Sequence, residues 1–199
     1  MKIVLATRNR DKLREIQEIF KSLPLEIITM DYYPNIPEVI EDGATLEQNA
    51  IKKASEVHNA TGLLAVADDT GLEVDYLDGR PGVYSSRFAG ENASYDDNVN
   101  KLLATMQGVP DEKRLARFRC VISIIGNGIH ELVEGSCPGV ILTGKRGSGG
   151  FGYDPVFFVP RYNQTFAEMS LALKNEISHR GQALRLAKAV LERILREKN

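Results

Sequence analysis

The chain contains 199 residues, of which 43% are hydrophobic and 26% are charged. These fractions are typical of a soluble globular protein and exclude a disordered, collagenous or coiled-coil chain. The 25 basic and 27 acidic residues give a net charge of -2. We expect no nucleic-acid partner, because proteins that coat nucleic acid normally carry a basic excess. No linker interrupts the chain, and we predict one domain over residues 1–199.

Charged residues are unevenly distributed along the chain. Residues 31–49 and 68–78 each contain five acids and no base, whereas residues 174–199 contain seven bases and three acids. Solvated surfaces are the simpler interpretation of such stretches, and charge alone favours it. The alternative is that the acidic and basic segments together form a site for a metal ion and a polyanion.

The sequence predicts a cytoplasmic protein without a membrane partner. The apolar run at the N-terminus is too short for a signal peptide. No apolar run approaches the roughly 18 residues that a membrane-spanning helix needs. Cys120 and Cys137 have no CxxC partner, which favours buried, reduced thiols.

Helices and strands alternate in the first half of the chain. The apolar spacing predicts a strand over residues 2–6, a helix over residues 11–21 and a strand over residues 25–30. Thr45 and Gln48 form a capping-box pattern that opens the next helix, and Gly62 lies just beyond its end. Residues 63–67 form an apolar run, typical of a central strand that delivers polar side chains at its carboxyl end.

The second half adds a hairpin to this pattern. Ser94 is expected to cap a helix, and residues 115–125 and 129–134 flank Asn127 and Gly128, a strong hairpin signal. A short strand over residues 156–159 and a helix over residues 182–197 follow. We therefore predict an α/β fold with a mixed β-sheet flanked by helices, because helical crossovers join parallel strands and hairpins join antiparallel ones. Two lobes with an active-site cleft between them are a further expectation.

Two glycine motifs fail in their sequence context. Residues 139–145 match a phosphate-binding P-loop, but Arg146 stands where a Ser or Thr hydroxyl is needed. Residues 147–152 fit GxGxxG, yet they lead into a strand instead of opening a helix, which excludes a dinucleotide-binding fold. A loop that brings backbone N–H groups to a ligand and a plain flexible turn both stay open for this segment.

Three acids are candidate ligands for a cation. Magnesium takes oxygen ligands, usually one or two carboxylates together with waters and substrate phosphates. Asp68 and Asp69 follow a buried strand, the position at which α/β proteins place ligands, and Glu41 comes from a loop. Asp-Asp-Thr-Gly is also a good turn sequence, so a structural turn is the alternative.

Residues 6–16 are candidates for binding an anion. They read as a strand, a polar turn and a helix start, a geometry that leaves free N–H groups. Thr7 and Asn9 can donate hydrogen bonds there, and the basic residues can meet phosphate charge; these are Arg8, Arg10 and Lys12. An ordinary helix cap is the alternative. His179 and Arg180 are adjacent donors near the start of the last helix, a weak signal by itself.

Five segments together resemble the inosine triphosphate pyrophosphatase family. In chain order they are ATRNRDK, EDGATLEQNAIKKA, ADDTGLEVDYLDGRPGVYSSRFAG, GSGGFGYDPVFF and ISHRGQAL. The resemblance extends over nearly the whole chain. It implies a homodimeric, magnesium-dependent hydrolase that converts the purine nucleotides ITP, dITP and XTP to the monophosphate and pyrophosphate, and so cleanses the nucleotide pool.

The resemblance also implies a role for each matching residue. It assigns catalysis to Asp69, Asp68 and Lys53, with Asp69 as general base, and the metal to Glu41 and Asp69. It assigns substrate binding to Thr7, Arg8, Asn9, Arg10, Asp11, Lys12, Thr70, Phe151, Gly152, Tyr153, Asp154, Lys174, His179 and Arg180. These side chains suit the reaction, because cations offset the charge of the leaving pyrophosphate while a carboxylate orients water. A non-catalytic nucleotide sensor and a general phosphatase are the competing hypotheses.

Overall fold

The computed structural model describes residues 1–197, which fall into two compact units. Unit 1 comprises Met1–Asp69, Cys120–Gly135 and the described part of His179–Asn199; unit 2 comprises Thr70–Arg119 and Ser136–Ser178. Three long strands supply residues to both units: β3 (Leu64–Val74), β5 (Leu115–Gly126) and β6 (Ile129–Ile141). The chain therefore passes between the units several times.

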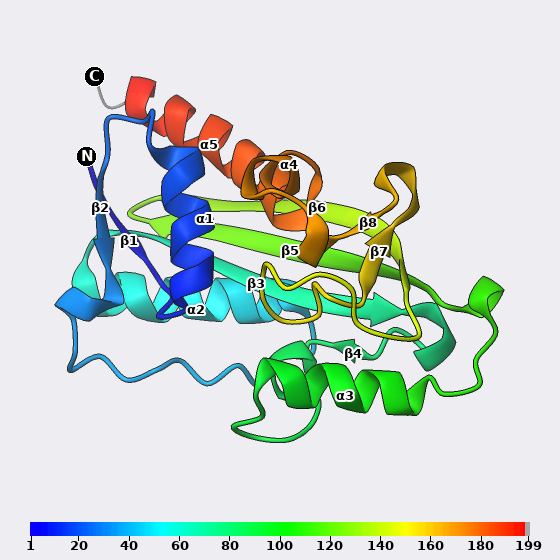
Figure 1. The fold of residues 1–199 in the computed structure, drawn as a ribbon. Coiled ribbons are helices and arrows are strands. Elements are labelled where there is room, and N and C mark those ends of the chain that lie inside the picture. Colours follow the sequence, from blue (N-terminus) through cyan, green and yellow to red (C-terminus); the bar gives the residue numbers. More distant parts are fainter. Residues whose placement is uncertain (198–199) are drawn as a thin grey trace. The chain divides into compact units, whose positions relative to one another are not determined.

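Unit 1 is a sheet with helices on both faces. Its strand order is β2-β1-β3-β5-β6, and β1 (Lys2–Leu5) pairs in parallel with β2 (Glu26–Thr29) and with β3. Figure 1 shows α1 (Arg10–Phe20) and α5 (His179–Glu197) on one face and α2 (Leu46–Thr61) on the other. The mixed sheet flanked by helices that the sequence predicts is confirmed.

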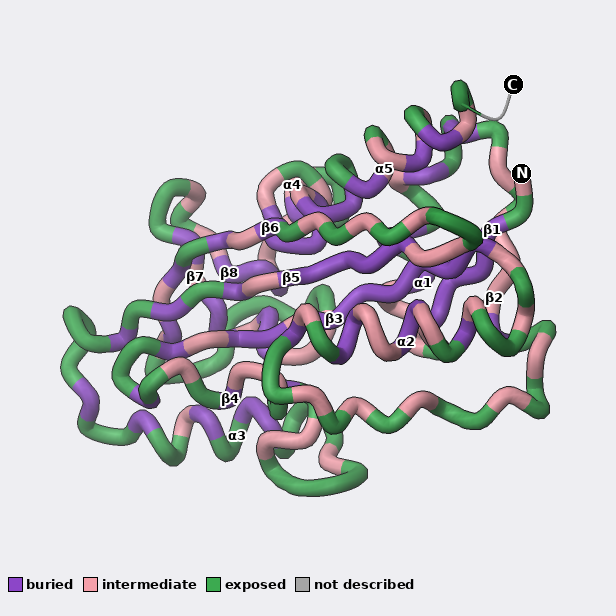
Figure 2. The backbone as a smooth tube through the Cα atoms, turned by 180° about the vertical axis from the view of Figure 1, so that it is seen from behind, coloured by how far each residue is buried: buried purple, intermediate pink, exposed green. Residues whose placement is uncertain are grey.

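Strand alternation explains the two faces of unit 1. Ile3, Leu5, Leu64 and Val66 join the core beneath α1 and α5, while their neighbours Val4, Ala65 and Ala67 join the core beneath α2. Successive side chains of a strand point to opposite faces, so an unbroken apolar run is what a strand covered on both sides requires. Figure 2 shows β3 and β5 buried along most of their length.

Unit 2 has its own apolar core. In this unit β4 (Pro81–Gly82) pairs with β3, and β6 is followed in the sheet by β7 (Phe157–Val159) and β8 (Gln164–Thr165). The helices are α3 (Tyr95–Thr105) and α4 (Leu171–Ile177). The aromatic rings of Phe118, Phe157 and Phe166 contact one another inside this core.

Most predicted elements are present, but several boundaries were wrong. β3 continues to Val74, so the expected strand end at residue 67 and the alternative of a turn are both wrong. The strand continues because Leu72 and Val74 are fully buried in the core of unit 2. β6 likewise extends beyond residue 134, and α5 begins at His179, ahead of residue 182. The Gln48 side chain accepts from the Ala44 N–H and not from the Thr45 N–H, although Thr45 caps the helix as predicted.

Other expectations hold. Cys120 and Cys137 are buried and form no disulfide, and burial raises the pKa of Cys137 to about 11. Within residues 1–197, no helix has the length and apolar character that crossing a membrane demands.

Arg114 stabilises unit 2 through backbone carbonyl groups. Its buried guanidinium donates to the carbonyl oxygens of Met106, Ile141 and Leu142 at 2.9, 2.6 and 2.8 Å. We expect Arg114→Met to lower the free energy of unfolding by about 3 kcal/mol, because buried acceptors lose charged donors. Urea unfolding would measure this, with exposed Lys113→Met as the matched control. Equal stability of the two variants would contradict the assignment.

Candidate active site

The acidic pair on β3 divides between the two faces of the sheet of unit 1. Asp68 and Asp69 are adjacent in a strand, so their side chains point in opposite directions. Asp68 follows Leu64 and Val66 on the face of α1 and α5, and Asp69 follows Ala65 and Ala67 on the face of α2. Both acids are buried. The pairing of β1 with β3 ends at Val66, so the pair lies just beyond the carboxyl end of the neighbouring parallel strand.

Asp68 belongs to a buried network of four charges. Its Oδ2 atom lies 3.0 Å from Lys12 Nζ and 3.3 Å from Arg180 Nε. Arg180 Nη1 lies 2.6 Å from Glu15 Oε2. Burial would raise the pKa of Asp68, but the charges of Lys12, Arg180 and Lys53 outweigh burial and hold it well below its usual value. Asp68 is therefore a fixed anion that holds two cations together.

Asp69 belongs to a second cluster, on the face of α2. Lys53 Nζ donates to Asp69 Oδ1 at 3.1 Å, to Glu41 Oε1 at 2.5 Å and to the Asp68 carbonyl oxygen at 2.7 Å. Asn49 Nδ2 donates to Asp69 Oδ2 at 3.3 Å, and Asn49 Oδ1 accepts from the Gly43 N–H at 2.8 Å. Asn49 thus ties the loop that carries Glu41 to the carboxylate of Asp69.

The two neighbouring carboxyl groups have opposite pKa shifts. Burial raises the pKa of Asp69, and the nearby charge of Glu41 adds to the rise, while Lys53 and Lys12 oppose it. Burial would lower the pKa of Lys53, but Asp69, Glu41 and Asp68 raise it further than burial lowers it, so its ammonium group stays charged. An acid pair whose pKa values move apart is typical of sites that separate a proton acceptor from a permanent anion.

The oxygen atoms around Lys53 suit a hard divalent cation. Among residues 1–197, no three His, Cys, Asp or Glu side chains gather closely enough to hold a metal by themselves. Magnesium does not need such a group, because it is usually bound through one or two carboxylates plus waters and phosphates. Glu41 and Asp69 converge on one ammonium group, so these two carboxylates fit the ion that the sequence predicts.

The N-terminal motif forms the start of α1. Asn9 caps the helix by accepting from the backbone N–H groups of Asp11 and Lys12, and Thr7 Oγ1 accepts from the Asn9 N–H. Lys12 reaches Asp68, while Arg10 is exposed. Arg8 donates to the carbonyl oxygens of Met30 and Ile36 at 3.3 and 2.8 Å. Asn9 therefore caps α1, which is the alternative that the sequence left open for this segment. Arg8 also stabilises the segment that follows β2 through its two hydrogen bonds.

Unit 2 holds a second group of predicted residues. Lys174 Nζ lies 2.6 Å from Asp154 Oδ2 and 4.6 Å from the centre of the Phe151 ring. Asp154 Oδ2 also accepts from the Phe151 N–H at 2.9 Å. The Phe151 ring is partly exposed and lies 5.8 Å from the ring of Tyr95. These contacts hold an aromatic face beside a buried ion pair.

The remaining predicted residues occupy varied positions. Tyr153 is a core residue of unit 2, with its hydroxyl donating to the Ser85 carbonyl oxygen at 2.9 Å, and burial raises its pKa. Gly152 adopts a positive φ of 62°, and Thr70 lies half-buried on β3. His179 is buried in the first turn of α5. In unit 1 the structure brings together Lys12, Glu41, Lys53, Asp68, Asp69 and Arg180.

Gly150 is required by its close approach to Asp154. Its φ is +70°, and a Cβ added there would lie 2.0 Å from Asp154 Oδ2. We expect Gly150→Ala to lower the free energy of unfolding by about 3 kcal/mol, because left-handed strain adds to a clash with a buried ion pair. Gly108→Ala is the control, since Gly108 has a φ of +74° and open space around it. Urea unfolding should show about 1 kcal/mol for that control; a loss at Gly150 no greater than this would refute the clash.

Sequence reasoning missed Glu15 and Asn49. Both carry polar side chains beside the apolar stripe of a helix, and both are buried, with 4% and 0% of their surface exposed. A polar residue at a buried helical position needs a partner, because an unpaired buried polar group is costly. That signal was present in the helical spacing of both residues.

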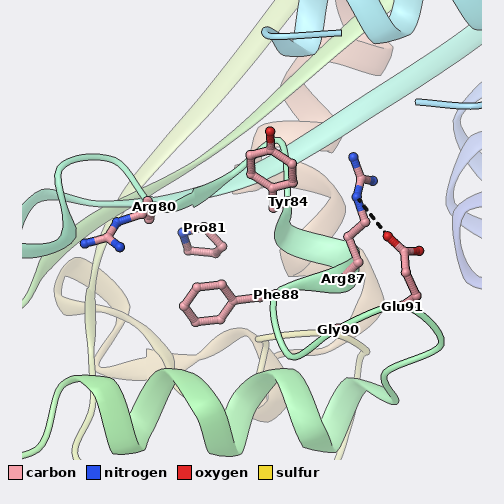
Figure 3. A pocket seen from close by; sticks show the side chains of 7 residues that line it. All are labelled: Arg80, Pro81, Tyr84, Arg87, Phe88, Gly90 and Glu91. Atoms are coloured by element: carbon pink, nitrogen blue, oxygen red, sulfur yellow. Dashed lines mark ion pairs between the residues drawn. The ribbon is translucent and has the colours of Figure 1, made fainter. Parts of the chain in front are cut away.

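A separate pocket lies in unit 2. Arg80, Pro81, Tyr84, Arg87, Phe88, Gly90 and Glu91 line it. Figure 3 shows the rings of Pro81, Tyr84 and Phe88 around its centre and the Arg87–Glu91 ion pair at one side. None of the residues in the Asp68 and Asp69 clusters lines this pocket.

The fold and the charged site together define a mixed α/β protein with buried carboxylates beside lysine and arginine, a combination suited to anionic substrates. Residues 3–190 match the Ham1 family, and the chain belongs to it. A protein from Desulforamulus reducens named dITP/XTP pyrophosphatase is 53% identical over 195 residues, 98% of this chain and 97% of that protein. A protein of the same name from Geobacter sulfurreducens is 53% identical over 94% of each chain.

Solved structures agree with this membership. A HAM1 protein from Coxiella burnetii superposes with a TM-score of 0.90 at 41% identity, over 97% of this chain and 99% of that one. The Ham1 protein of Staphylococcus aureus superposes with a TM-score of 0.87 at 40% identity, over 96% of this chain and 98% of that one. The predicted family and fold are confirmed.

Proposed function

We propose that this protein hydrolyses the non-canonical purine nucleoside triphosphates dITP, ITP and XTP to the monophosphate and pyrophosphate. The observation that carries the proposal is the convergence of Glu41 and Asp69 on one cationic position, in a chain 53% identical to relatives named dITP/XTP pyrophosphatase. A nucleotide sensor would not need this arrangement of carboxylates, which supports an enzyme over a sensor.

The substrate contacts follow from the two residue groups. Residues 7–12 and Lys53 bind the triphosphate, supported by the position of residues 7–12 at the N-terminus of α1 and by the positive charge of Lys12. Phe151 stacks on the purine, supported by its partly exposed ring and the fixed ion pair of Asp154 and Lys174 beside it. The family resemblance also assigns substrate binding to Thr70, Gly152 and Tyr153 of unit 2 and to His179 and Arg180 of unit 1.

Magnesium is the proposed cofactor, held by Glu41 and Asp69. When bound, the ion neutralises charge on the phosphate oxygens and stabilises the leaving pyrophosphate. Support comes from the donor set, since two carboxylates on a hard cation are the usual protein share of a magnesium site.

The proposed reaction is a displacement at the α-phosphorus. A water molecule forms the new bond to this phosphorus, and the bond to the oxygen that bridges the α- and β-phosphates breaks, with its electron pair leaving on pyrophosphate. Asp69 accepts the proton of the water, while Asp68 remains an anion that fixes Lys12 and Arg180. Lys12 and Lys53 offset the charge that develops on the leaving group.

The test is a product assay on the purified protein with magnesium. We expect dITP, ITP and XTP to yield pyrophosphate as the first product, with GTP and ATP turned over far more slowly. Orthophosphate as the first product would support a phosphatase and contradict the proposal. Tight nucleotide binding without any product would support the sensor.

We also propose that the protein is a cytoplasmic homodimer. The family resemblance supports the homodimer, and exposed Tyr76 and Tyr84 on unit 2 are of the residue type enriched at protein interfaces. The cytoplasmic location is supported by two cysteines that form no disulfide. Sedimentation equilibrium should give twice the mass of one chain. A monomer across the micromolar range would contradict the homodimer.

A further inference from the structure

The ammonium group of Lys53 lies where the oxygen atoms of the Asp69 cluster converge. It contacts Glu41 Oε1, the Asp68 carbonyl oxygen and Asp69 Oδ1 at 2.5, 2.7 and 3.1 Å. These contacts match the three donors of a lysine ammonium group. Only 9% of the Lys53 side chain is exposed. The protein's own cation therefore occupies the oxygen atoms that suit a metal ion.

Two carboxylates meet at Lys53, whereas two cations meet at Asp68 on the other face of β3. On the other face of β3, Asp68 is paired with Lys12 and Arg180, and Arg180 also holds Glu15. On this face Lys53 bridges two carboxylates, Glu41 and Asp69, with one positive charge. The carboxylate oxygen atoms that suit a divalent cation are therefore already hydrogen-bonded to an ammonium group.

We propose that Lys53 is a resident counter-ion that weakens the binding of a free divalent cation and couples it to the arrival of a polyphosphate. This inference rests on the proposed function, which assigns the cation to Glu41 and Asp69. Like charges cannot share these oxygen atoms closely, so the ammonium group must move when a cation binds. Polyphosphate oxygens give it new partners. By linkage, the two ligands then strengthen each other's binding.

The test measures Mn²⁺ affinity without nucleotide, from the electron paramagnetic resonance signal of free Mn²⁺. We expect Lys53→Met to bind Mn²⁺ about 10-fold more tightly than the wild-type protein, because the competing charge is gone. Lys52→Met is the matched control: it removes a neighbouring charge of α2 that pairs with Asp42 at 2.7 Å, and its Mn²⁺ affinity should change less than about 2-fold. Equal or weaker Mn²⁺ binding by Lys53→Met would overturn the proposal.

Two further measurements complete the test. Lys53→Arg keeps the charge, so its Mn²⁺ binding should stay weak; tightening equal to that of Lys53→Met would overturn the proposal. In the wild-type protein, the nitrogen resonance of the Lys53 ammonium group, assigned by its loss in Lys53→Arg, should shift when Mg²⁺ and pyrophosphate are added. An unchanged resonance would overturn the proposal even if Lys53→Met does not fold.

The proposed function and the counter-ion can fail separately. If the wild-type protein released no pyrophosphate while Lys53→Met gained Mn²⁺ affinity, the enzymatic assignment would fail and the counter-ion would stand. If the wild-type protein released pyrophosphate and Lys53→Met showed no gain of Mn²⁺ affinity, the enzymatic assignment would stand and the counter-ion role of Lys53 would fail.

Discussion

Asp69→Asn is expected to lower kcat for dITP about 1,000-fold while the variant still binds the nucleotide. Asparagine keeps the shape of the side chain but cannot accept the proton of the attacking water, and general-base catalysis contributes roughly 100- to 10,000-fold. Asp69 stays hydrogen-bonded to Lys53 and Asn49 in the wild-type protein, so the substitution changes the proton acceptor within an otherwise fixed cluster. Pyrophosphate release under saturating substrate measures the loss.

The control for this variant is Asp42→Asn. Asp42 is exposed, lies next to Glu41 in the sequence and pairs with Lys52, so its kcat should stay within about 2-fold of the wild-type value. A kcat for Asp69→Asn within about 5-fold of wild type would show that another group accepts the proton.

Arg180→Met is expected to lower the free energy of unfolding by about 4 kcal/mol. Removing one partner of a buried ion pair leaves uncompensated charge and typically costs roughly 3 to 5 kcal/mol. Arg180 is 3% exposed and contacts both Glu15 and Asp68, so two buried carboxylates would lose their guanidinium. Urea unfolding followed by circular dichroism measures the loss.

Exposed Arg185 on the same helix provides the control, and Arg185→Met should cost less than about 1 kcal/mol. Adding Glu15→Gln to Arg180→Met should restore part of the stability, because one uncompensated carboxylate is removed. If Arg180→Met were as stable as its control, the network would not be a stabilising element of unit 1.

The sequence predicts the fold best where local pattern and tertiary packing agree. The parallel strands of unit 1 are visible as apolar runs, and the Ser94 cap and the Asn127–Gly128 hairpin follow from local chemistry. The sequence fails to predict where β3 ends. Asp-Asp-Thr-Gly has the composition of a turn, but burial of Leu72 and Val74 extends the strand through it. Tertiary packing overrides local preference there.

The site is predictable in its residues but not in its arrangement. Asp68 and Asp69 are visible as an acidic pair, yet their placement on opposite faces follows only once both are known to lie within a strand. That division gives one carboxylate to Lys12 and Arg180 and the other to Lys53 and Asn49. Each unit also combines separate chain segments, which no composition shift along the sequence marks.

Hydrolysis in ¹⁸O-labelled water distinguishes attack at the α-phosphorus from attack at the β- or γ-phosphorus. Mass spectrometry of the products of dITP would show which phosphorus the water attacks. Attack at the α-phosphorus, with Asp69 accepting the proton, predicts one heavy oxygen in the monophosphate and none in pyrophosphate. A heavy oxygen in pyrophosphate or in orthophosphate would contradict the reaction derived for this site.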